Sequence, residues 1–283
     1  MEKLTFTNSK GQSVELGGNA PFILTKIEGT GAVDVNIQSQ KSPYQDGSTY
    51  LDNTLEPRPI SIEVMLLANM IGEMTENRHR LLRVFNPKLG PGKLVYQLGN
   101  IKREIEAISE LAPVFSDAGD FKETMQPGLI QLYCPNPFWL DEFETSEEII
   151  TWIGGIRFPL RLPTGFATAG DKIINVINKG DVETPIKLEI YGPATNPKIT
   201  KRETGEYLKV KRELTADDVV VVTTDFGNKR VELNGENAFN ILDLPDSNFF
   251  SLDIGDNVIE LTTEDVTNNA NVKISYRNRY IGI

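Results

Sequence analysis

Apolar and polar residues alternate along much of the first 140 residues, and this period of two predicts β-strands. The pattern places successive side chains on opposite faces of a sheet. The predicted strands are 21–28, 32–37, 58–66, 93–98, 102–108 and 129–134. Turn residues separate two pairs of them. Gly29-Thr30-Gly31 predicts a hairpin between the first two strands, and Gly99-Asn100 predicts another between 93–98 and 102–108.

One segment in this half follows the helical period instead. Thr75 is a candidate N-cap, and Leu81, Leu82 and Phe85 form one apolar face before Asn86-Pro87 ends the helix. A helix with a single apolar face packs against a sheet. The first 140 residues therefore predict a β domain with one helix.

A polar stretch of twenty residues, Gln38–Pro57, interrupts the strands. It has no regular pattern and contains Pro43, Gly47 and Pro57 as breakers. Long irregular segments inside a compact domain are usually functional loops. We therefore expect either an arm that reaches a neighbouring subunit or a disordered surface loop.

The pattern changes near Asp141. A charged stretch rich in proline and glycine predicts a linker or crossing over about 141–170. Short strands then recur with turns between them, and Asn234-Gly235 is a strong turn signal. The predicted strands are 172–177, 185–191, 218–223, 229–233, 257–261 and 271–276. This spacing, without a helical period, predicts an antiparallel β-sandwich over 141–283.

The composition limits the classes of partner. The chain of 283 residues is long enough for two domains of ordinary size. Its formal net charge is −11, and its basic residues form only short groups with acidic neighbours. Because phosphate binding requires clustered Lys and Arg, direct nucleic-acid binding and docking on an anionic membrane are both disfavoured. No apolar run is long enough to span a membrane.

Compartment and redox chemistry follow from two local features. The opening residues, Met1–Phe6, lack the apolar stretch of a signal peptide, so synthesis in a cytoplasm is expected. Cys134 is the single cysteine, which excludes an intrachain disulfide and a zinc site built on cysteines. It follows an apolar run, and we expect a small buried hydrophobic residue rather than a nucleophile.

Candidate catalytic groups are sparse. His79, the single histidine, lies in the predicted helix between two arginines, where a solvated side chain is expected. Glu104 and Glu106 share a strand face through simple alternation. Asp217-Asp218 and Asp253–Asn257 have the composition of turns rather than of a glycosidase pair or a calcium loop. No phosphate-binding glycine loop is present. The sequence therefore predicts a non-enzymatic protein with no catalytic, cofactor-binding or metal-binding residues.

Aromatic side chains leave one alternative open. Trp139, Trp152, Phe249-Phe250, Tyr276 and Tyr280 are expected mostly in the core, since adjacent residues on a strand face opposite ways. If they were exposed on one face, they would form a platform for sugars. The second domain would then be a carbohydrate-binding adhesin module.

Several motifs occur in a fixed order along nearly the whole chain. After Gly31 they are Gln45-Asp46-Gly47-Ser48-Thr49-Tyr50, Glu56-Pro57-Arg58-Pro59-Ile60, Asn77-Arg78 with Leu81-Leu82, Tyr133-Cys134-Pro135-Asn136-Pro137-Phe138-Trp139, Phe158-Pro159-Leu160-Arg161-Leu162-Pro163, Asn248–Asn257 and Arg279–Ile283. In this order they resemble the distal tail (Dit) proteins of siphophages or prophages. Two departures are Ile254 and Asp256, where the family has a proline and a small residue.

The resemblance implies a homohexameric ring at the distal end of a long non-contractile tail. Residues 1–140 would form the ring and stack on the tail-tube protein. Residues 141–283, galectin-like in fold, would carry baseplate or receptor-binding components. The tape measure and a tail-associated lysin would be neighbours, the virion tail tip would be the location, and a host glycan is a possible ligand.

Assembly of such a ring needs two different surfaces on each subunit. An extended arm can add a strand to a neighbour through main-chain hydrogen bonds. Our candidate interface residues are Lys41, Tyr44, Asp46 and Tyr50 within the polar stretch, together with Arg58.

Overall fold

The computed structural model describes residues 2–116, 124–150, 152–153, 168–169, 172–264 and 270–283. Within them the chain forms two compact units. The first contains Met1–Glu142 and Tyr280–Ile283, and the second contains Phe143–Arg279. The closing residues thus join the first unit, whereas the sequence analysis assigned them to the second domain. The motif Phe158–Pro163, the centre of the predicted linker and the side chain of Trp152 lie outside the described residues.

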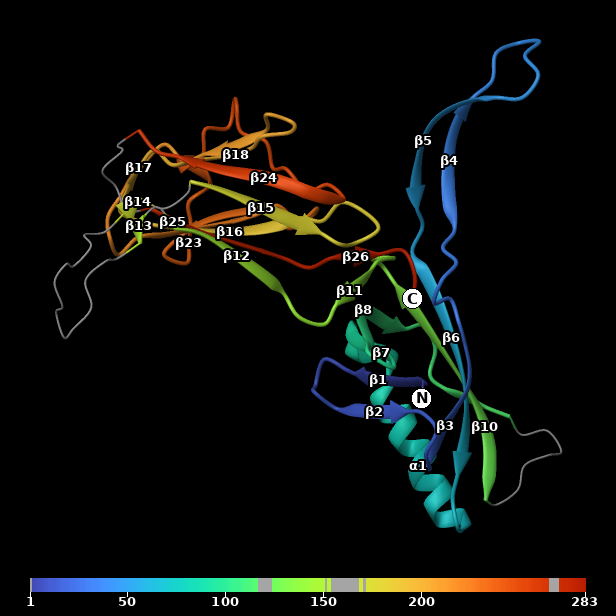
Figure 1. The fold of residues 1–283 in the computed structure, drawn as a ribbon. Coiled ribbons are helices and arrows are strands. Elements are labelled where there is room, and N and C mark those ends of the chain that lie inside the picture. Colours follow the sequence, from blue (N-terminus) through green and yellow to red (C-terminus); the bar gives the residue numbers. More distant parts are fainter. Residues whose placement is uncertain (1, 117–123, 151, 154–167, 170–171, 265–269) are drawn as a thin grey trace, which may run out of the picture. The chain divides into compact units, whose positions relative to one another are not determined.

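The first unit is a strongly curved antiparallel sheet with one helix (Figure 1). Its main strands follow the order β2-β1-β7-β8-β10-β6-β3. Gly17, the residue after β2, forms an isolated bridge with Ile23 of β3. The strands are β1 (Glu2–Thr7), β2 (Ser13–Leu16), β3 (Phe22–Glu28), β6 (Arg58–Leu67), β7 (Gly92–Leu98), β8 (Ile101–Ser109), β9 (Val114–Phe115), β10 (Met125–Cys134), β11 (Trp139–Asp141) and β26 (Arg279–Tyr280).

Strict alternation explains the core of this unit. Along β6 and β10, every second residue is buried, including Ile60, Ile62, Ile130 and Leu132. The longest register in the unit joins these two strands over ten residue pairs. Burial of such aliphatic side chains contributes about 1.5–3 kcal/mol each relative to exposure. The predicted hairpin at Gly99-Asn100 is confirmed, because β7 and β8 pair on either side of it.

The helix α1 (Ile71–Val84) covers one face of this sheet and ends before the short 3₁₀ helix η1 (Pro87–Leu89). Its buried side chains include Leu81, and Phe85 stacks on Phe6 with 4.6 Å between ring centroids. The predicted cap at Thr75 was wrong. The helix begins at Ile71, four residues before Thr75, and Met70 occupies the N-cap position. The Glu73 carboxylate in the first turn accepts from the backbone N–H of Asn69 at 2.8 Å.

The second unit is an antiparallel β-sandwich, as predicted. One sheet has the order β12-β25-β16-β21-β22-β23, and the other has the order β15-β24-β18-β19. Small pairs are β13–β14 and β17–β20. The elements are β12 (Thr145–Ile150), β13 (Trp152–Ile153), β14 (Thr168–Ala169), β15 (Ile173–Asn178), β16 (Ile186–Tyr191), β17 (Ala194–Thr195), β18 (Lys198–Lys201), β19 (Tyr207–Lys209), β20 (Glu213–Leu214), β21 (Val219–Thr223), β22 (Arg230–Leu233), β23 (Glu236–Asn237), η2 (Phe239–Ile241), β24 (Gly255–Thr262) and β25 (Asn271–Tyr276).

Inward side chains of both sheets form one apolar core. Val176 and Ile259 come from the smaller sheet, and Leu188, Val222 and Ile274 come from the larger one. All five are buried, since each occupies an inward position of an alternating strand. The overall class, mainly β with a single helix among the described residues, is therefore the predicted one.

Candidate functional site

The polar stretch of the first unit forms a long hairpin that projects from the sheet (Figure 1). Its strands are β4 (Val35–Gln40) and β5 (Thr49–Leu55), and we refer to residues 33–56 as the arm. The prediction of an irregular segment was wrong. The two strands pair only with each other, from Val35 opposite Leu55 to Gln40 opposite Thr49. The predicted hairpin at Gly29-Thr30-Gly31 was also wrong, because β3 pairs with β6 and β4 pairs with β5.

The arm has two chemically different faces. Val35 and Ile37, with their partners Leu55 and Asn53, share one face of the ribbon, and three of these four side chains are aliphatic. Asn36 and Gln38, with their partners Thr54 and Asp52, occupy the other. A register shift between Gln38 and Ser39 inserts Leu51 as an extra residue in β5. Every residue of β4 is exposed, and so is every residue of β5 except Leu55. The arm therefore presents an apolar face that nothing in its own unit covers.

A compact loop closes the tip of the arm. The Gln45 side chain accepts from the backbone N–H of Ser42 at 3.0 Å and donates to the Thr49 hydroxyl at 3.3 Å. Tyr44 adopts a left-handed backbone with a φ of 64°, which is unusual for a residue with a side chain. Its ring is fully exposed. The loop thus holds an aromatic side chain outward in a fixed backbone conformation.

The candidate interface residues Lys41, Tyr44, Asp46 and Tyr50 all lie in this tip or beside it. The structure brings them together on one hairpin. Tyr44 and Tyr50 are exposed, with Tyr50 at 58% of its reference area. Lys41 is exposed, and Asp46 is exposed as well. All four are accessible to a partner.

Arg58 has a different role from the one predicted. Its side chain is completely buried, so it cannot contact a neighbouring subunit. Its guanidinium donates to the carbonyl oxygens of Gly29 (2.6 Å), Ala32 (3.4 Å), Pro137 (2.8 Å) and Ile281. Burial lowers the pKa of this guanidinium, but arginine keeps its charge at any ordinary pH. The buried charge is therefore stabilised by carbonyl dipoles.

These carbonyls surround the place where the arm leaves the sheet, residues Gly29–Ala32, which we call the arm root. Trp139 is buried beside it and donates its indole N–H to the Thr30 carbonyl at 3.1 Å. Gly29 has a φ of +88°, and a Cβ there would lie 2.1 Å from the Pro59 carbonyl oxygen. Only glycine fits this position. The arm root is thus fixed by main-chain acceptors that the sequence analysis did not detect.

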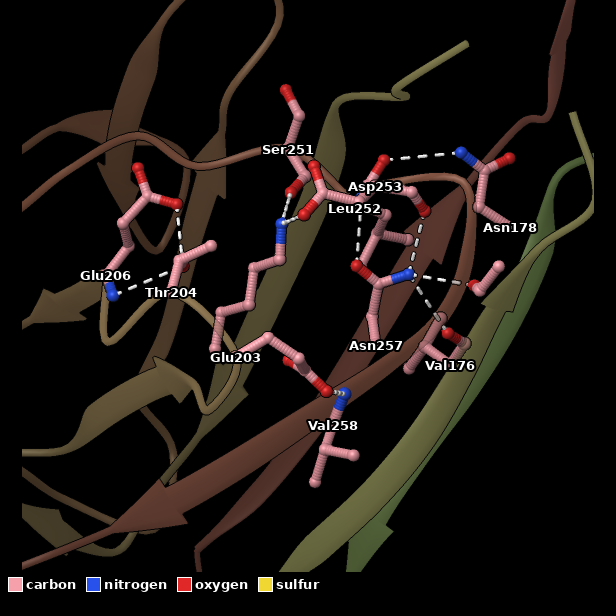
Figure 2. Close-up of polar contacts among 12 residues, drawn as sticks. Val176, Asn178, Glu203, Thr204, Glu206, Ser251, Leu252, Asp253, Asn257 and Val258 are labelled. Atoms are coloured by element: carbon pink, nitrogen blue, oxygen red, sulfur yellow. Dashed lines mark hydrogen bonds and ion pairs between the residues drawn. The ribbon is translucent and has the colours of Figure 1, made fainter. Parts of the chain in front are cut away.

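A second polar cluster organises the signature Asn248–Asn257 in the second unit (Figure 2). The amide nitrogen of Asn257 donates to the carbonyls of Asp253 (2.9 Å) and Gly255 (3.0 Å), and its oxygen accepts from the Asp253 N–H at 2.8 Å. The buried Lys201 ammonium donates to the Ser251 carbonyl at 3.0 Å and pairs with the Asp253 carboxylate at 2.6 Å. This side chain and Asn257 hold one loop in one conformation.

The same contacts bear on the calcium alternative. One Asp253 oxygen is engaged by Lys201, and the Asn257 side chain is engaged by the backbone of Asp253 and Gly255. Among the described residues, no group of three or more His, Cys, Asp or Glu side chains is arranged to hold a metal ion. Asp253 and Asn257 thus make the hydrogen bonds within a loop that are the ordinary use of Asp and Asn in turns.

The other chemically reactive side chains occupy ordinary structural positions. His79 is exposed on α1, as expected. Cys134 is buried, and burial raises the pKa of its thiol to about 12. Glu104 is buried and paired with Lys93 at 3.0 Å, whereas Glu106 is exposed. These two carboxylates therefore lie in different environments without a shared cleft between them.

Turn carboxylates in the second unit are engaged in the same structural way. Asp218 accepts from the Thr215 backbone N–H at 2.8 Å and from Asn234 at 2.9 Å, and these bonds lower its pKa. Glu264 accepts from Asn196 and Lys209, which lowers its pKa too. Both groups stabilise turns.

The aromatic side chains are mostly buried or half-buried. Trp139, Phe250 and Tyr276 are buried, and Phe249 is partly buried against the core and stacked on Phe239. Phe226 and Phe143 are exposed. The rings on which the sugar-platform alternative depended are therefore mostly core side chains where the structure describes them.

Comparisons with known proteins agree with this architecture. A family model described as the phage tail protein RIFT-related domain matches residues 9–134. Another, described as the siphovirus-type tail component C-terminal domain, matches residues 179–280. Together these two models account for most of the chain and divide it as the two compact units do. No curated protein sequence matches the chain significantly.

Solved structures share the fold at low sequence identity. The crystal structure of the Dit protein of phage SPP1 has a TM-score of 0.67 and 14% identity, and covers 98% of each chain. A chain of the phage P2 baseplate in its activated conformation with calcium has a TM-score of 0.53 and 12% identity over both complete chains. The same baseplate with strontium gives 0.50 and 12%, covering 97% of this chain and 98% of that one. With its two matching family models and this shared fold, the chain belongs to the siphophage distal tail protein family, a family of structural phage tail components.

Proposed function

We propose that this protein is a non-enzymatic hub whose copies close into a hexameric ring at the distal end of a long non-contractile tail. Membership in the distal tail family supports this role. Two solved relatives are described as part of a hub adsorption apparatus and of a baseplate. The first unit forms the ring and contacts the tail tube, the tape measure and the tail-associated lysin. The second unit, which we expect to be galectin-like, carries receptor-binding or baseplate proteins.

The arm is the observation that carries the proposal. A two-stranded hairpin alone is marginally stable in water, and it needs a third strand or a packed face. The strands β4 and β5 pair only with each other among the described residues, so both outer edges offer unpaired main-chain groups. The apolar face of Val35, Ile37 and Leu55 is uncovered as well. A neighbouring subunit would pair with an open edge of the hairpin by adding a strand, and it would cover the apolar face.

A ring built this way uses two different surfaces on each copy. The arm is one of them, and the body of the next subunit provides the other. Tyr44 and Tyr50 serve as aromatic contacts at the tip, with Lys41 and Asp46 as the polar contacts around them. Exposed aromatic side chains that are already held in place bind with little loss of conformational entropy.

Location and excluded partners follow from the same proposal. The protein resides in the virion at the tail tip and is made in the host cytoplasm. Among the described residues, no helix has the length and hydropathy needed to cross a membrane. The formal charge of −11 disfavours direct binding of nucleic acid by any one copy.

Shortening the arm tests the proposal. Gln38 lies opposite Asp52, so replacing Ser39–Leu51 by Asn-Gly leaves a pair that a two-residue type I′ turn can close. We expect the parent chain to form annular particles in negative-stain microscopy and the shortened chain to remain monomeric in light scattering. Rings of normal size from the shortened chain would show that the arm is not the ring contact.

A matched pair of point variants tests which face of the arm contributes to ring formation. Ile37→Gln changes the apolar face, and Thr54→Gln changes the polar face of the same ribbon. We expect Ile37→Gln to weaken ring formation about tenfold or more and Thr54→Gln to have little effect. Discrete monomers of the parent chain that bind host glycans would instead favour the adhesin alternative.

A further inference from the structure

We propose that the first unit contains a peptide-binding site at the arm root, that its occupant is the chain's own segment Tyr280–Ile283, and that this occupancy fixes the arm. The effect on assembly rests on the proposed function. The site itself rests on contacts within the first unit alone. Its three components are the Arg58 guanidinium, the arm root Gly29–Ala32, and the face of β8 and β11 that receives Tyr280.

One guanidinium joins the segment to the arm root. Arg58 donates through Nη2 to the Ile281 carbonyl and through Nη1 to the Gly29 carbonyl. It is completely buried and forms no ion pair within the described part of the chain. A buried cation without a carboxylate partner depends on each hydrogen bond that it makes. The Ile281 carbonyl is therefore a required acceptor and not an incidental neighbour.

Contacts hold the segment on both sides of Ile281, through the Tyr280 side chain before it and the Gly282 backbone after it. The Arg103 guanidinium lies over the Tyr280 ring, 3.7 Å from its centroid, and also pairs with Asp141 at 2.7 Å. Gly282 packs directly on the arm root. A Cβ at Gly282 would lie 3.1 Å from the Gly31 Cα and 3.4 Å from the Thr30 carbonyl oxygen. This glycine allows the two backbones to approach closely.

Because the chain is synthesised from its N-terminus, the arm root is made long before the segment that covers it. Arg58 and Ile281 are 223 residues apart in sequence, so the acceptor is made long after the arm. Until then the buried guanidinium lacks one of its acceptors, and Gly282 does not cover the arm root. We expect an arm with an incompletely held root to fluctuate. Ring contacts through the arm would therefore form efficiently only in chains that extend through this segment.

Hydrogen–deuterium exchange on a chain that contains both units tests this site. The measurement uses the shortened arm (Ser39–Leu51 replaced by Asn-Gly), so that protection by a neighbouring copy does not contribute. Removing Tyr280–Ile283 should accelerate exchange about tenfold or more at the amides of residues 29–36 and 53–58. Exchange in β16 and β21 of the second unit should not change. Unchanged exchange at the arm root would overturn the proposal.

Two glycine variants keep the test decisive if the truncated chain folds poorly. Gly282→Ala places a methyl group against the arm root, whereas a Cβ at Gly31 meets nothing within 4 Å. We expect faster root exchange in Gly282→Ala and parent-like exchange in Gly31→Ala. Equal exchange in both variants would contradict the proposed contact. Because these measurements need no ring, they judge the site even if shortening the arm leaves ring formation intact and the proposed function fails.

Discussion

Among the described residues, each unit has one completely or almost completely buried cationic side chain, and the two charges are stabilised in different ways. Arg58 in the first unit has carbonyl acceptors at Gly29, Ala32, Pro137 and Ile281, which belong to distant parts of the chain. Lys201 in the second unit contacts a single loop. A planar guanidinium has five donors in fixed directions, and an ammonium has three on a flexible stem. The arginine therefore joins several segments, whereas the lysine fixes one loop.

The two buried cations also differ in whether a carboxylate balances their charge. The Asp253 carboxylate that pairs with Lys201 is 57% exposed, so water stabilises it as well. Arg58 has only carbonyl dipoles. Removing Lys201 leaves a hydrated carboxylate, whereas removing Arg58 takes the donor from four part-buried hydrogen bonds at once. Groups shielded from water cost more than exposed ones when they lose a partner.

The largest expected effect comes from Arg58→Met. We expect it to destabilise the first unit by about 3–5 kcal/mol, because four part-buried carbonyl oxygens lose this donor at once. Arg58→Lys should lose less, since the charge remains while most of the directed donors disappear. Lys201→Met, the matched change in the second unit, should cost about 1 kcal/mol.

Tryptophan fluorescence during urea unfolding measures the first-unit change. In a Trp152→Phe background, the emission reports on Trp139, which is buried in the first unit. Exchange at β24 amides reports on the second unit. Similar losses from Arg58→Met and Lys201→Met would show that the number of joined segments does not matter.

Asn257→Ala is expected to have the next largest effect. It removes the bonds that the buried Asn257 amide makes to the Asp253 and Gly255 backbone, at a cost of about 1–3 kcal/mol. Asn175→Ala is the control, because its bond to Asp256 is exposed and should contribute about 0–0.5 kcal/mol. Exchange at residues 253–257 measures both. Equal protection in the two variants would mean that the loop is held by packing alone.

Alkaline pH should weaken the first unit through Cys134. Burial raises the pKa of its thiol to about 12, so the folded chain keeps the proton that the unfolded chain releases above about pH 8.5. Stability is therefore complete below that pH and declines as pH rises toward 12. The loss near pH 10.5 should be about 2 kcal/mol. Urea unfolding of Cys134→Val across this range should show a shallower decline, and an identical slope would remove the thiol as its cause.

Acid should weaken the second unit slightly through Glu189. Hydrogen bonds from Lys187 and Tyr191 lower the pKa of its carboxyl group. The resulting stability is present above the unfolded pKa near 4.5 and is lost as pH falls through the lower folded pKa. The pair is near the surface, so the effect should be below about 1 kcal/mol. Thermal unfolding of Glu189→Gln between pH 3 and 6 should show less acid sensitivity than the parent. The opposite slope would contradict the assignment.

Strands and turns were predictable where neighbouring residues carry the signal. Alternation located β6, β10 and β16, and Gly99-Asn100 and Asn234-Gly235 marked real turns between paired strands. The wrong predictions concern which strand pairs with which. Gly29–Gly31 looked like a hairpin turn, but β3 pairs with β6 across the intervening arm. The arm was identified as a special segment, yet its exposed strands lack the one-sided burial that makes a strand recognisable.

The exposure of the candidate interface residues was predictable for four of them and not for Arg58. Lys41, Tyr44, Asp46 and Tyr50 lie in a polar stretch, and polar surroundings indicate exposure. Arg58 was grouped with them because a charged residue is rarely buried completely. No pattern near Arg58 reveals that it is buried, since its acceptors are backbone carbonyls.

The sequence by itself determined the mainly β class, the single helix, the change of character near Asp141 and the presence of a projecting segment. These depend on periodicity and turn chemistry, which act over a few residues. Only the tertiary structure decided that Arg58 is an anchor, that the arm is a paired hairpin, and that Tyr280–Ile283 returns to the first unit. The physical reason is that backbone carbonyls are the same at every position. Which of them meets a buried guanidinium depends on how distant segments come together.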